Sequence, residues 1–190
     1  MKPSDDIGGA MPMMGILRDS FSREHAQRVG NLAAAIAAEM RLGSCTQEGL
    51  RIMGRVHDLG TIAIPAEILN KPKGLTQAEY ALVRTHSEAG YDIVGAAAFQ
   101  WPVATAVLQH HERMDGSGYP KGIKGREIII EARILAVADV VEAMASHRPH
   151  RPPLGIKAAL DEIDKNAGVL YDSVVGQACL RLFKKGYKLH

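Results

Sequence analysis

Cysteine is scarce in this chain of 190 residues: only Cys45 and Cys179 occur, and they do not form a CxxC pair. Two distant cysteines give no basis for a disulfide framework or for a metal site built on thiolates. Long hydrophobic runs are also missing, since no window approaches the ~20 apolar residues that a membrane helix needs. We therefore predict a soluble chain that stays in the reducing cytoplasm and does not enter a membrane.

The excess of charge of one sign is equally small, because 23 Lys and Arg stand against 21 Asp and Glu. This balance does not indicate a nucleic-acid polymer or a membrane surface as partner. Residues 1–16 carry aspartates and glycines where a signal peptide would need an apolar core, and we expect a flexible lead-in there. Residues 17–190 are then long enough for one domain with a sizeable core.

Helical patterns dominate what is present. Residues 22–41, for example, combine an alanine-rich composition with apolar positions at three-and-four spacing. Gly43 and Gly60 are expected to end the first two helices. The predicted helices are 22–41, 46–58, 64–69, 76–95, 102–111, 131–146, 155–164 and 172–184. Only residues 128–130 suggest a brief strand, so the sequence predicts the all-α class.

The helix starting near residue 76 has the clearest local signals. Thr76 and Glu79 have the spacing of a capping box, and Leu75 and Tyr80 have the spacing of a hydrophobic staple. Pro102 suits the first turn of the following helix. These signals depend only on residues a few positions apart.

Potential metal ligands recur on these helices, and two pairs of them are adjacent in sequence. Asp139 stands in the apolar stretch ILAVADVVEAM, where a carboxylate must be solvated, paired or metal-bound. Taken singly, His25 and His86 would fit ordinary surface or capped histidines, but the adjacent pairs favour a metal site. The candidate ligands are His25, His57, Asp58, His86, His110, His111 and Asp139.

Adjacent residues of a helix point about 100° apart, so they are better placed to reach two neighbouring ions than one. A carboxylate has two oxygens and can bridge, which makes Asp58 the natural shared ligand. The other six ligands would divide into two sets of three and leave positions for water. A two-metal site of this kind holds a bridging hydroxide, and its usual chemistry is phosphate ester hydrolysis.

Several stretches, in this order, resemble the HD-GYP domain: EHAQRV, VHDLGT, THSEAGYDIV, QHHERMDGSGYPKGIKG, EARILAVADVVEAMASHRPHR and GVLYDSVVGQACLRLF. The resemblance extends from about residue 17 to the C-terminus. It implies an all-helical bundle of the HD superfamily with a glycine-rich GYP loop, here residues 115–125. It also implies hydrolysis of cyclic di-GMP to linear pGpG, with further cleavage to GMP left open.

The resemblance implies how the ligands divide between two divalent ions, with iron or manganese favoured. Phe21 stands where some members carry a glutamate that holds a third metal, so we expect two ions. One ion would be held by His25, His57, Asp58 and Asp139, and the other by Asp58, His86, His110 and His111.

Substrate contacts are implied at two further places. Gly118, Tyr119 and Pro120 match the namesake motif, which closes the edge of the site and offers a surface to a diguanylate cyclase (GGDEF) or sensor-domain partner. Arg148 and Arg151 match positions that hold substrate phosphate. Without the resemblance, the loop would read as an ordinary turn and the arginines as solvated surface.

One departure bears on catalysis, which the resemblance assigns to Asp58 and to the position of Thr61. Thr61 stands where the family carries a lysine thought to touch the scissile phosphate, so a donor is kept and a charge is lost. Arg55 or Lys73 are alternative sources of that charge. His150 replaces an aromatic residue and could still stack on a base or bind phosphate.

The leading hypothesis is therefore a metal-dependent cyclic di-GMP phosphodiesterase. The alternative is a catalytically weak or inactive HD-GYP module that binds a cyclic dinucleotide or a diguanylate cyclase. Hydrolysis of another cyclic dinucleotide or of a mononucleotide is a third hypothesis. A homodimer is left open, as is the choice between a fragment of a longer protein and a chain switched by a separate partner.

Overall fold

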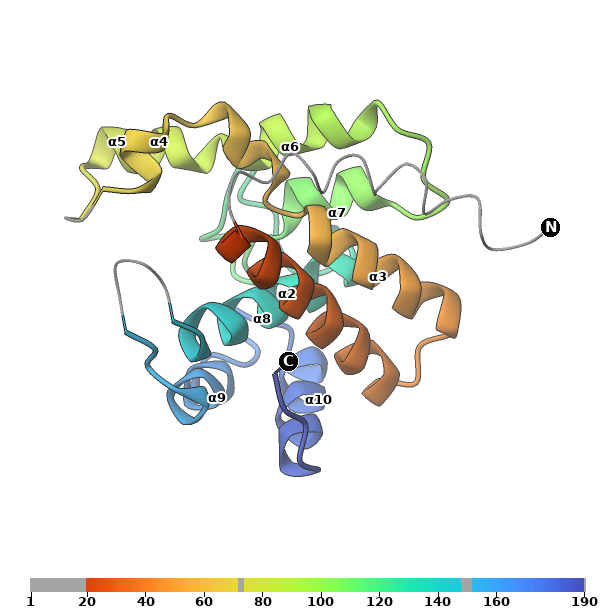
Figure 1. Ribbon diagram of the computed structural model, residues 1–190. Coiled ribbons are helices and arrows are strands. Elements are labelled where there is room, and N and C mark those ends of the chain that lie inside the picture. The colour runs from red at the N-terminus through yellow and green to blue at the C-terminus, as the bar shows by residue number, and fades with distance from the viewer. Residues whose placement is uncertain (1–19, 72–73, 148–151, 190) are drawn as a thin grey trace.

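The computed structural model describes residues 20–71, 74–147 and 152–189, and all regular elements in these ranges are helical (Figure 1). This confirms the all-α class. The elements in chain order are α2 (Ser20–Glu39), α3 (Ser44–Val56), η1 (Leu59–Ala63), α4 (Ala66–Leu69), α5 (Gln77–Arg84), α6 (His86–Gly95), α7 (Val103–Gln109), η2 (Gly125–Glu127), α8 (Ile130–Ala145), α9 (Ile156–Lys165) and α10 (Ser173–Lys184). The brief strand predicted at residues 128–130 is wrong, because α8 already begins at Ile130.

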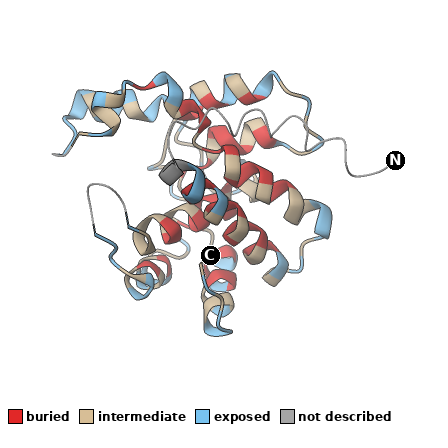
Figure 2. Cartoon of the chain, in the orientation of Figure 1, coloured by how far each residue is buried: buried red, intermediate tan, exposed pale blue. Residues whose placement is uncertain are grey.

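The core lies between α2, α3 and α8, and α7, α9 and α10 close its sides. Figure 2 shows the buried faces of these helices turned toward one another. The helices α4 and α5 contain no buried residue and form an arm at one end of the molecule (Figure 1). Among the largest fully buried side chains are Leu32, Ile36, Leu50, Met53, Ile134, Leu135 and Ile163. Tight packing of α2, α3 and α8 holds three of the five ligand-bearing helices in fixed relative positions.

One predicted helix is divided in two. The helix expected over 76–95 is interrupted at Thr85, whose amide and hydroxyl both donate to the Leu82 carbonyl, at 3.1 and 2.8 Å. A hydroxyl that bonds to the preceding turn competes with the regular helical pattern. The interruption makes His86 the first residue of α6 instead of a residue in mid-helix.

The local signals are confirmed in part. Thr76 and Glu79 form the predicted capping box. Leu75 and Tyr80, however, remain 36% and 46% exposed, so the predicted staple does not bury them. The stop assigned to Gly43 is also wrong: Arg41, with a φ of 61°, follows the end of α2, and Gly43 is the N-cap of α3.

Gly60 does not end α3 as expected, because α3 ends at Val56 and Gly60 lies within η1. A Cβ at Gly60 would meet the His86 carbonyl oxygen at 2.0 Å and the Gly90 nitrogen at 2.4 Å. The glycine therefore allows η1 to lie directly against the backbone of α6. In the ranges that the structure describes, no helix combines the length and apolar character needed to cross a membrane.

Candidate metal centre

The structure brings the seven candidate ligands together from five helices. His25 lies on α2 and Asp139 on α8, whereas the others lie at helix ends. His57 caps the C-terminus of α3 and is followed by Asp58, while His86 begins α6. His110 caps the C-terminus of α7 and is followed by His111. Five of the seven ligands thus lie where a helix begins or ends, and His25 and Asp139 lie within α2 and α8.

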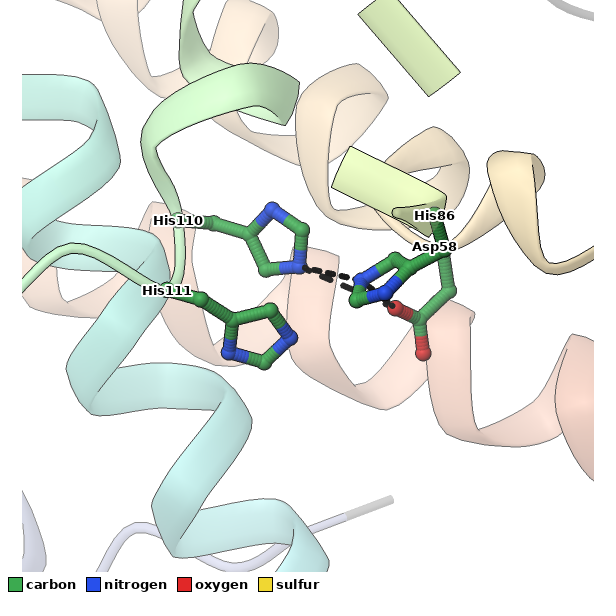
Figure 3. A group of neighbouring side chains, drawn as sticks. All are labelled: Asp58, His86, His110 and His111. Atoms are coloured by element: carbon green, nitrogen blue, oxygen red, sulfur yellow. Dashed lines mark hydrogen bonds and ion pairs between the residues drawn. The ribbon is translucent and has the colours of Figure 1, made fainter. Parts of the chain in front are cut away.

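One group of ligand atoms gathers around Oδ1 of Asp58. The Nε2 atoms of His86 and His110 lie 3.4 and 3.7 Å from this oxygen. With one ring nitrogen of His111, these atoms all lie within 4.8 Å of one another. Figure 3 shows the rings of His86 and His110 directed toward the Asp58 carboxylate, with His111 beside His110.

A second group gathers around the other oxygen of the same carboxylate. Oδ2 of Asp58 lies 3.4 Å from Nε2 of His57 and 3.9 Å from Nε2 of His25. Oδ1 of Asp139 lies 3.4 Å from Nε2 of His25 and 3.8 Å from Nε2 of His57. The two oxygens of Asp58 thus face two different sets of histidines, which is the arrangement of a bridging carboxylate.

His110 and His111 depart from the expectation that adjacent residues diverge. Both contribute to the same group, and their ring centroids are only 4.0 Å apart. The regular helix ends at Gln109, so the geometry of successive helical side chains does not apply to this pair. Only the His57–Asp58 pair reaches toward both groups.

The inner ring nitrogens of three ligand histidines can each offer a lone pair to a cation. Three ligand histidines place Nδ1 at 2.6–2.7 Å from a backbone carbonyl, and a carbonyl can only accept, so Nδ1 carries the hydrogen. The pairs are His57 with Gly54, His86 with Val83 and His110 with Val107. Nε2 of His25 and Nε2 of His57 are buried without a hydrogen-bond partner. Buried unpartnered nitrogens beside carboxylates fit a divalent metal ion.

Glu142 is a functional candidate that the sequence analysis did not single out. Its side chain is only 1% exposed, and its two oxygens accept from Nδ1 of His25 and from Nε of Arg28, the latter at 2.6 Å. Glu142 lies three residues after Asp139 on α8, in the same apolar stretch. That i, i+3 spacing places the two carboxylates on one helix face. The spacing is a sequence signal that could have identified Glu142 as a candidate.

The charges of the cluster compensate one another. Burial alone would raise the pKa of Asp58, but His57 and His110 outweigh it and hold that pKa well below its ordinary value. Burial alone would lower the pKa of His25, but Asp139 and Glu142 outweigh it and raise that pKa to about 9. The pKa of His111 is lowered by burial and by His110, which keeps that ring neutral. A cation at the carboxylates would replace the protons on the histidines.

The GYP loop folds back onto the cluster. Tyr119 donates its amide to the His111 carbonyl at 3.2 Å, and its ring stacks on the His111 ring with centroids 4.7 Å apart. Buried Glu112 accepts from the Lys121 amide at 2.7 Å, just after Pro120. A Cβ at Gly118 would meet the backbone of residues 111–113 at 2.5 Å, so glycine permits this close return. The loop therefore covers the His111 side of the centre.

Thr61 has a local partner. Its hydroxyl donates to the Asp58 carbonyl at 2.7 Å, and its amide donates to the same oxygen at 3.0 Å. Its donor is thus engaged with the backbone of the bridging residue. Arg148, His150, Arg151 and Lys73 lie outside the described residues, as does the side chain of Phe21.

Sequence comparison supplies the family. The sequence profile of the HD domain matches residues 12–175. The chain belongs to the HD domain family. The resemblance to HD-GYP proteins read from the motifs is confirmed as well. A His/Asp cluster in an HD domain is suited to binding divalent metal ions.

Curated relatives of this HD domain include three bacterial enzymes. A cyclic di-GMP phosphodiesterase of Thermotoga maritima is 39% identical over 177 residues, covering 91% of this chain and 48% of the relative. The cyclic di-GMP phosphodiesterase response regulator RpfG of Xanthomonas campestris is 36% identical, with 86% and 44% covered. The 3'3'-cGAMP-specific phosphodiesterase 1 of Vibrio cholerae is 34% identical, with 95% and 42% covered. The chain thus spans less than half the length of these relatives.

Solved structures show the same fold at low sequence identity. Bd1817, an HDG"Y"P protein of Bdellovibrio bacteriovorus, has a TM-score of 0.70 and 19% identity, covering 86% of this chain and 52% of that chain. The cyclic GMP-AMP specific phosphodiesterase V-cGAP3 of V. cholerae has a TM-score of 0.69 and 18% identity, covering 93% and 49%. At such identities the likeness establishes the helical architecture of the HD domain and no more.

Proposed function

We propose that this HD domain is a metal-dependent phosphodiesterase that hydrolyses cyclic di-GMP to linear pGpG, with GMP as a further product. The observation that carries the proposal is the bridging position of Asp58 between two sets of histidines. In this proposal two divalent ions, iron or manganese, are the cofactors. Similar chains named as phosphodiesterases of cyclic di-GMP and of 3'3'-cGAMP support a cyclic dinucleotide as the substrate class.

The ligands would divide as the geometry groups them. His25, His57 and Asp139 would hold one ion with Asp58, and His86, His110 and His111 would hold the other with Asp58. When bound, such ions activate water for attack on phosphorus and neutralise charge on the phosphoryl oxygens.

The remaining residues position this centre. The backbone contacts at Nδ1 keep three histidine rings aimed inward, and Tyr119 shields His111 from water. Thr61 fixes the turn that carries Asp58, and we assign it this positioning role in place of a phosphate contact. Arg148 and Arg151 remain the proposed phosphate contacts. A GGDEF partner at the GYP loop and a cytoplasmic location belong to the same proposal.

One observation favours a second candidate function, a module that binds a cyclic dinucleotide without hydrolysing it. The hydroxyl of Thr61 is engaged with the Asp58 carbonyl. Among the residues described, no lysine or arginine forms an ion pair with Asp58 or Asp139. In this part of the chain, no side-chain cation is therefore held at these two carboxylates to stabilise charge on a bound phosphate.

Turnover by metal-loaded protein separates the two candidates. We expect protein loaded anaerobically with Fe²⁺ or Mn²⁺ to convert cyclic di-GMP to pGpG. Chromatography of pGpG and GMP measures this turnover. His110→Ala should abolish turnover, whereas His147→Ala, an exposed histidine outside the cluster, should leave it unchanged. Binding of cyclic di-GMP without any product, in protein with two ions bound, would identify the binding module instead.

A further inference from the structure

Arg84 occupies an unusual position at the edge of the metal centre. It is the last residue of α5 and is exposed, and its guanidinium carbon lies 4.8 Å from the ring centroid of Tyr80 and 4.8 Å from that of Tyr119. Tyr80 stands one helical turn earlier on α5, whereas Tyr119 comes from the GYP loop. Cation–π attraction to two rings fixes the direction of the guanidinium.

These side chains form a column that leads to the ligands. The Tyr119 ring stacks on His111 at an interplanar angle of 28°, and His111 belongs to the group around Oδ1 of Asp58. His111, Tyr119, Arg84 and Tyr80 therefore follow one another from the metal centre to the surface. The outermost member, Tyr80, is 46% exposed.

The charge of Arg84 is not used within the described protein. In the described ranges no carboxylate pairs with Arg84, and its guanidinium contacts the two tyrosine rings. A guanidinium flanked by rings still presents N–H donors in its own plane, as a rigid fork. Such a fork is matched by a ligand that offers two adjacent acceptors in one plane.

A cyclic dinucleotide would bring a nucleobase to this place. With its phosphate at the metal centre, the next groups outward are the ribose and then the base, whose planar edge can meet the in-plane N–H donors of the guanidinium. Guanine presents two adjacent acceptors, N7 and O6, on one edge. Adenine presents N7 beside an amino donor, which a guanidinium cannot match.

We infer that Arg84, held between Tyr80 and Tyr119, selects guanine over adenine in the cyclic dinucleotide bound at this centre. The inference rests on the proposed function, since it names the base that the same site recognises. A contact from Arg84 to the second phosphate of the substrate is the competing explanation. That contact would favour all cyclic dinucleotides equally.

Arg84→Lys tests the assignment because it keeps the charge and removes the fork. We expect kcat/KM for cyclic di-GMP to fall about tenfold or more, the loss of one bidentate contact to guanine. The value for cyclic di-AMP and for bis(p-nitrophenyl) phosphate, which has no base, should change less than about twofold. Arg181→Lys is the matched control, because Arg181 pairs with Glu39 at the far end of α2.

Tyr80→Ala gives an independent variant that leaves the core intact, since Tyr80 is half-exposed. It frees one side of the guanidinium and should reduce the preference for cyclic di-GMP in the same direction, at an unchanged melting temperature. Equal losses for cyclic di-GMP and cyclic di-AMP in Arg84→Lys would assign Arg84 to phosphate and overturn the inference. No loss for either substrate would also overturn it.

Failure of the proposed function gives a different result. In that case wild-type protein hydrolyses no cyclic dinucleotide, and calorimetric affinities of the metal-loaded protein test the selection directly. Preference of wild type for cyclic di-GMP over cyclic di-AMP, lost in Arg84→Lys, supports the inference without turnover. Equal affinities in wild type, or no binding of either dinucleotide, would overturn it.

Discussion

The ligand histidines of the two groups around Asp58 differ in the partner that accepts a hydrogen bond from Nδ1. His57, His86 and His110 donate Nδ1 to backbone carbonyls three residues earlier, which for His86 is the Val83 carbonyl of the preceding helix α5. His25 instead meets a carboxylate, Glu142, which is itself held by Arg28. A carboxylate behind a histidine increases the basicity of the ring and fixes its orientation toward a metal. An ion bound at His25 would therefore have a ligand of different electronic character.

Glu142→Gln should weaken one metal site selectively. The amide keeps the shape of the side chain but removes the negative charge behind His25. We expect the affinity of one of the two ions to fall roughly 10- to 100-fold while the other is unchanged. Titration calorimetry with Mn²⁺ measures the two affinities. The ¹⁵N shifts of the His25 ring in the metal-free protein report the change in that ring.

Glu24→Gln is the control for this variant, because Glu24 is the other carboxylate near Arg28 and is exposed. It should leave both affinities as in wild type. Equal weakening of both ions in Glu142→Gln would mean that Glu142 supports the fold as a whole and not His25 in particular.

At the scale of elements, the contact between η1 and α6 sets the distance between the two ligands that they carry. Asp58 immediately precedes η1, and His86 begins α6. The approach is so close that a Cβ at Gly60 would lie 2.0 Å from the carbonyl oxygen of His86 itself. Backbone on the facing side cannot rotate away as a flexible side chain would.

Gly60→Ala should therefore destabilise the protein and spread the ligands. Overpacking of this kind costs about 1–3 kcal/mol, which chemical denaturation measures as a lower midpoint. The affinity for the ion between Asp58 and His86 should fall as well. Gly95→Ala, at the C-terminal end of α6 with open space around its Cβ position, should be neutral or slightly stabilising. Similar denaturation midpoints for the two variants would show that η1 can shift away from α6 at little cost, which would contradict this prediction.

At the scale of the whole molecule, the candidate metal centre bears on stability, because its ligands come from α2, α3, α6, α7 and α8. Without a cation, the clustered carboxylates depend on protonated histidines for compensation, as the raised pKa of His25 indicates. A ligand that binds only the folded state stabilises it by mass action. Metal binding should therefore stabilise the whole helical bundle.

Metal analysis tests the bridging arrangement at this scale. We expect about two equivalents of metal per chain, and a free energy of unfolding raised by about 3 kcal/mol per ion at a hundredfold excess over Kd. Asp58→Ala should remove both equivalents, whereas His25→Ala and His86→Ala should each remove one. Equal losses in the three variants, or a wild-type value of zero or three, would contradict a carboxylate shared by two ions.

Much of this architecture follows from patterns along the chain. Periodic apolar residues predicted helices close to those observed, and the capping box at Thr76 and Glu79 forms as expected. The capping box depends on side chains within a few positions of one another, where helix geometry already determines which groups can meet. The adjacent pairs His57–Asp58 and His110–His111 indicated a metal site, and the structure places both pairs in a His/Asp cluster, while the number of ions stays a prediction.

Other features depend on tertiary contacts. The carboxylate behind His25 comes from Glu142, 117 residues further along the chain, and the ring beside Arg84 comes from the GYP loop. Two further contacts, between Thr61 and Asp58 and between the rings of His110 and His111, are local, but they depend on how a helix ends, which periodicity does not specify. Local periodicity determines which face of each helix is buried, but the packing of α2, α3, α6, α7 and α8 against one another decides which buried polar groups meet.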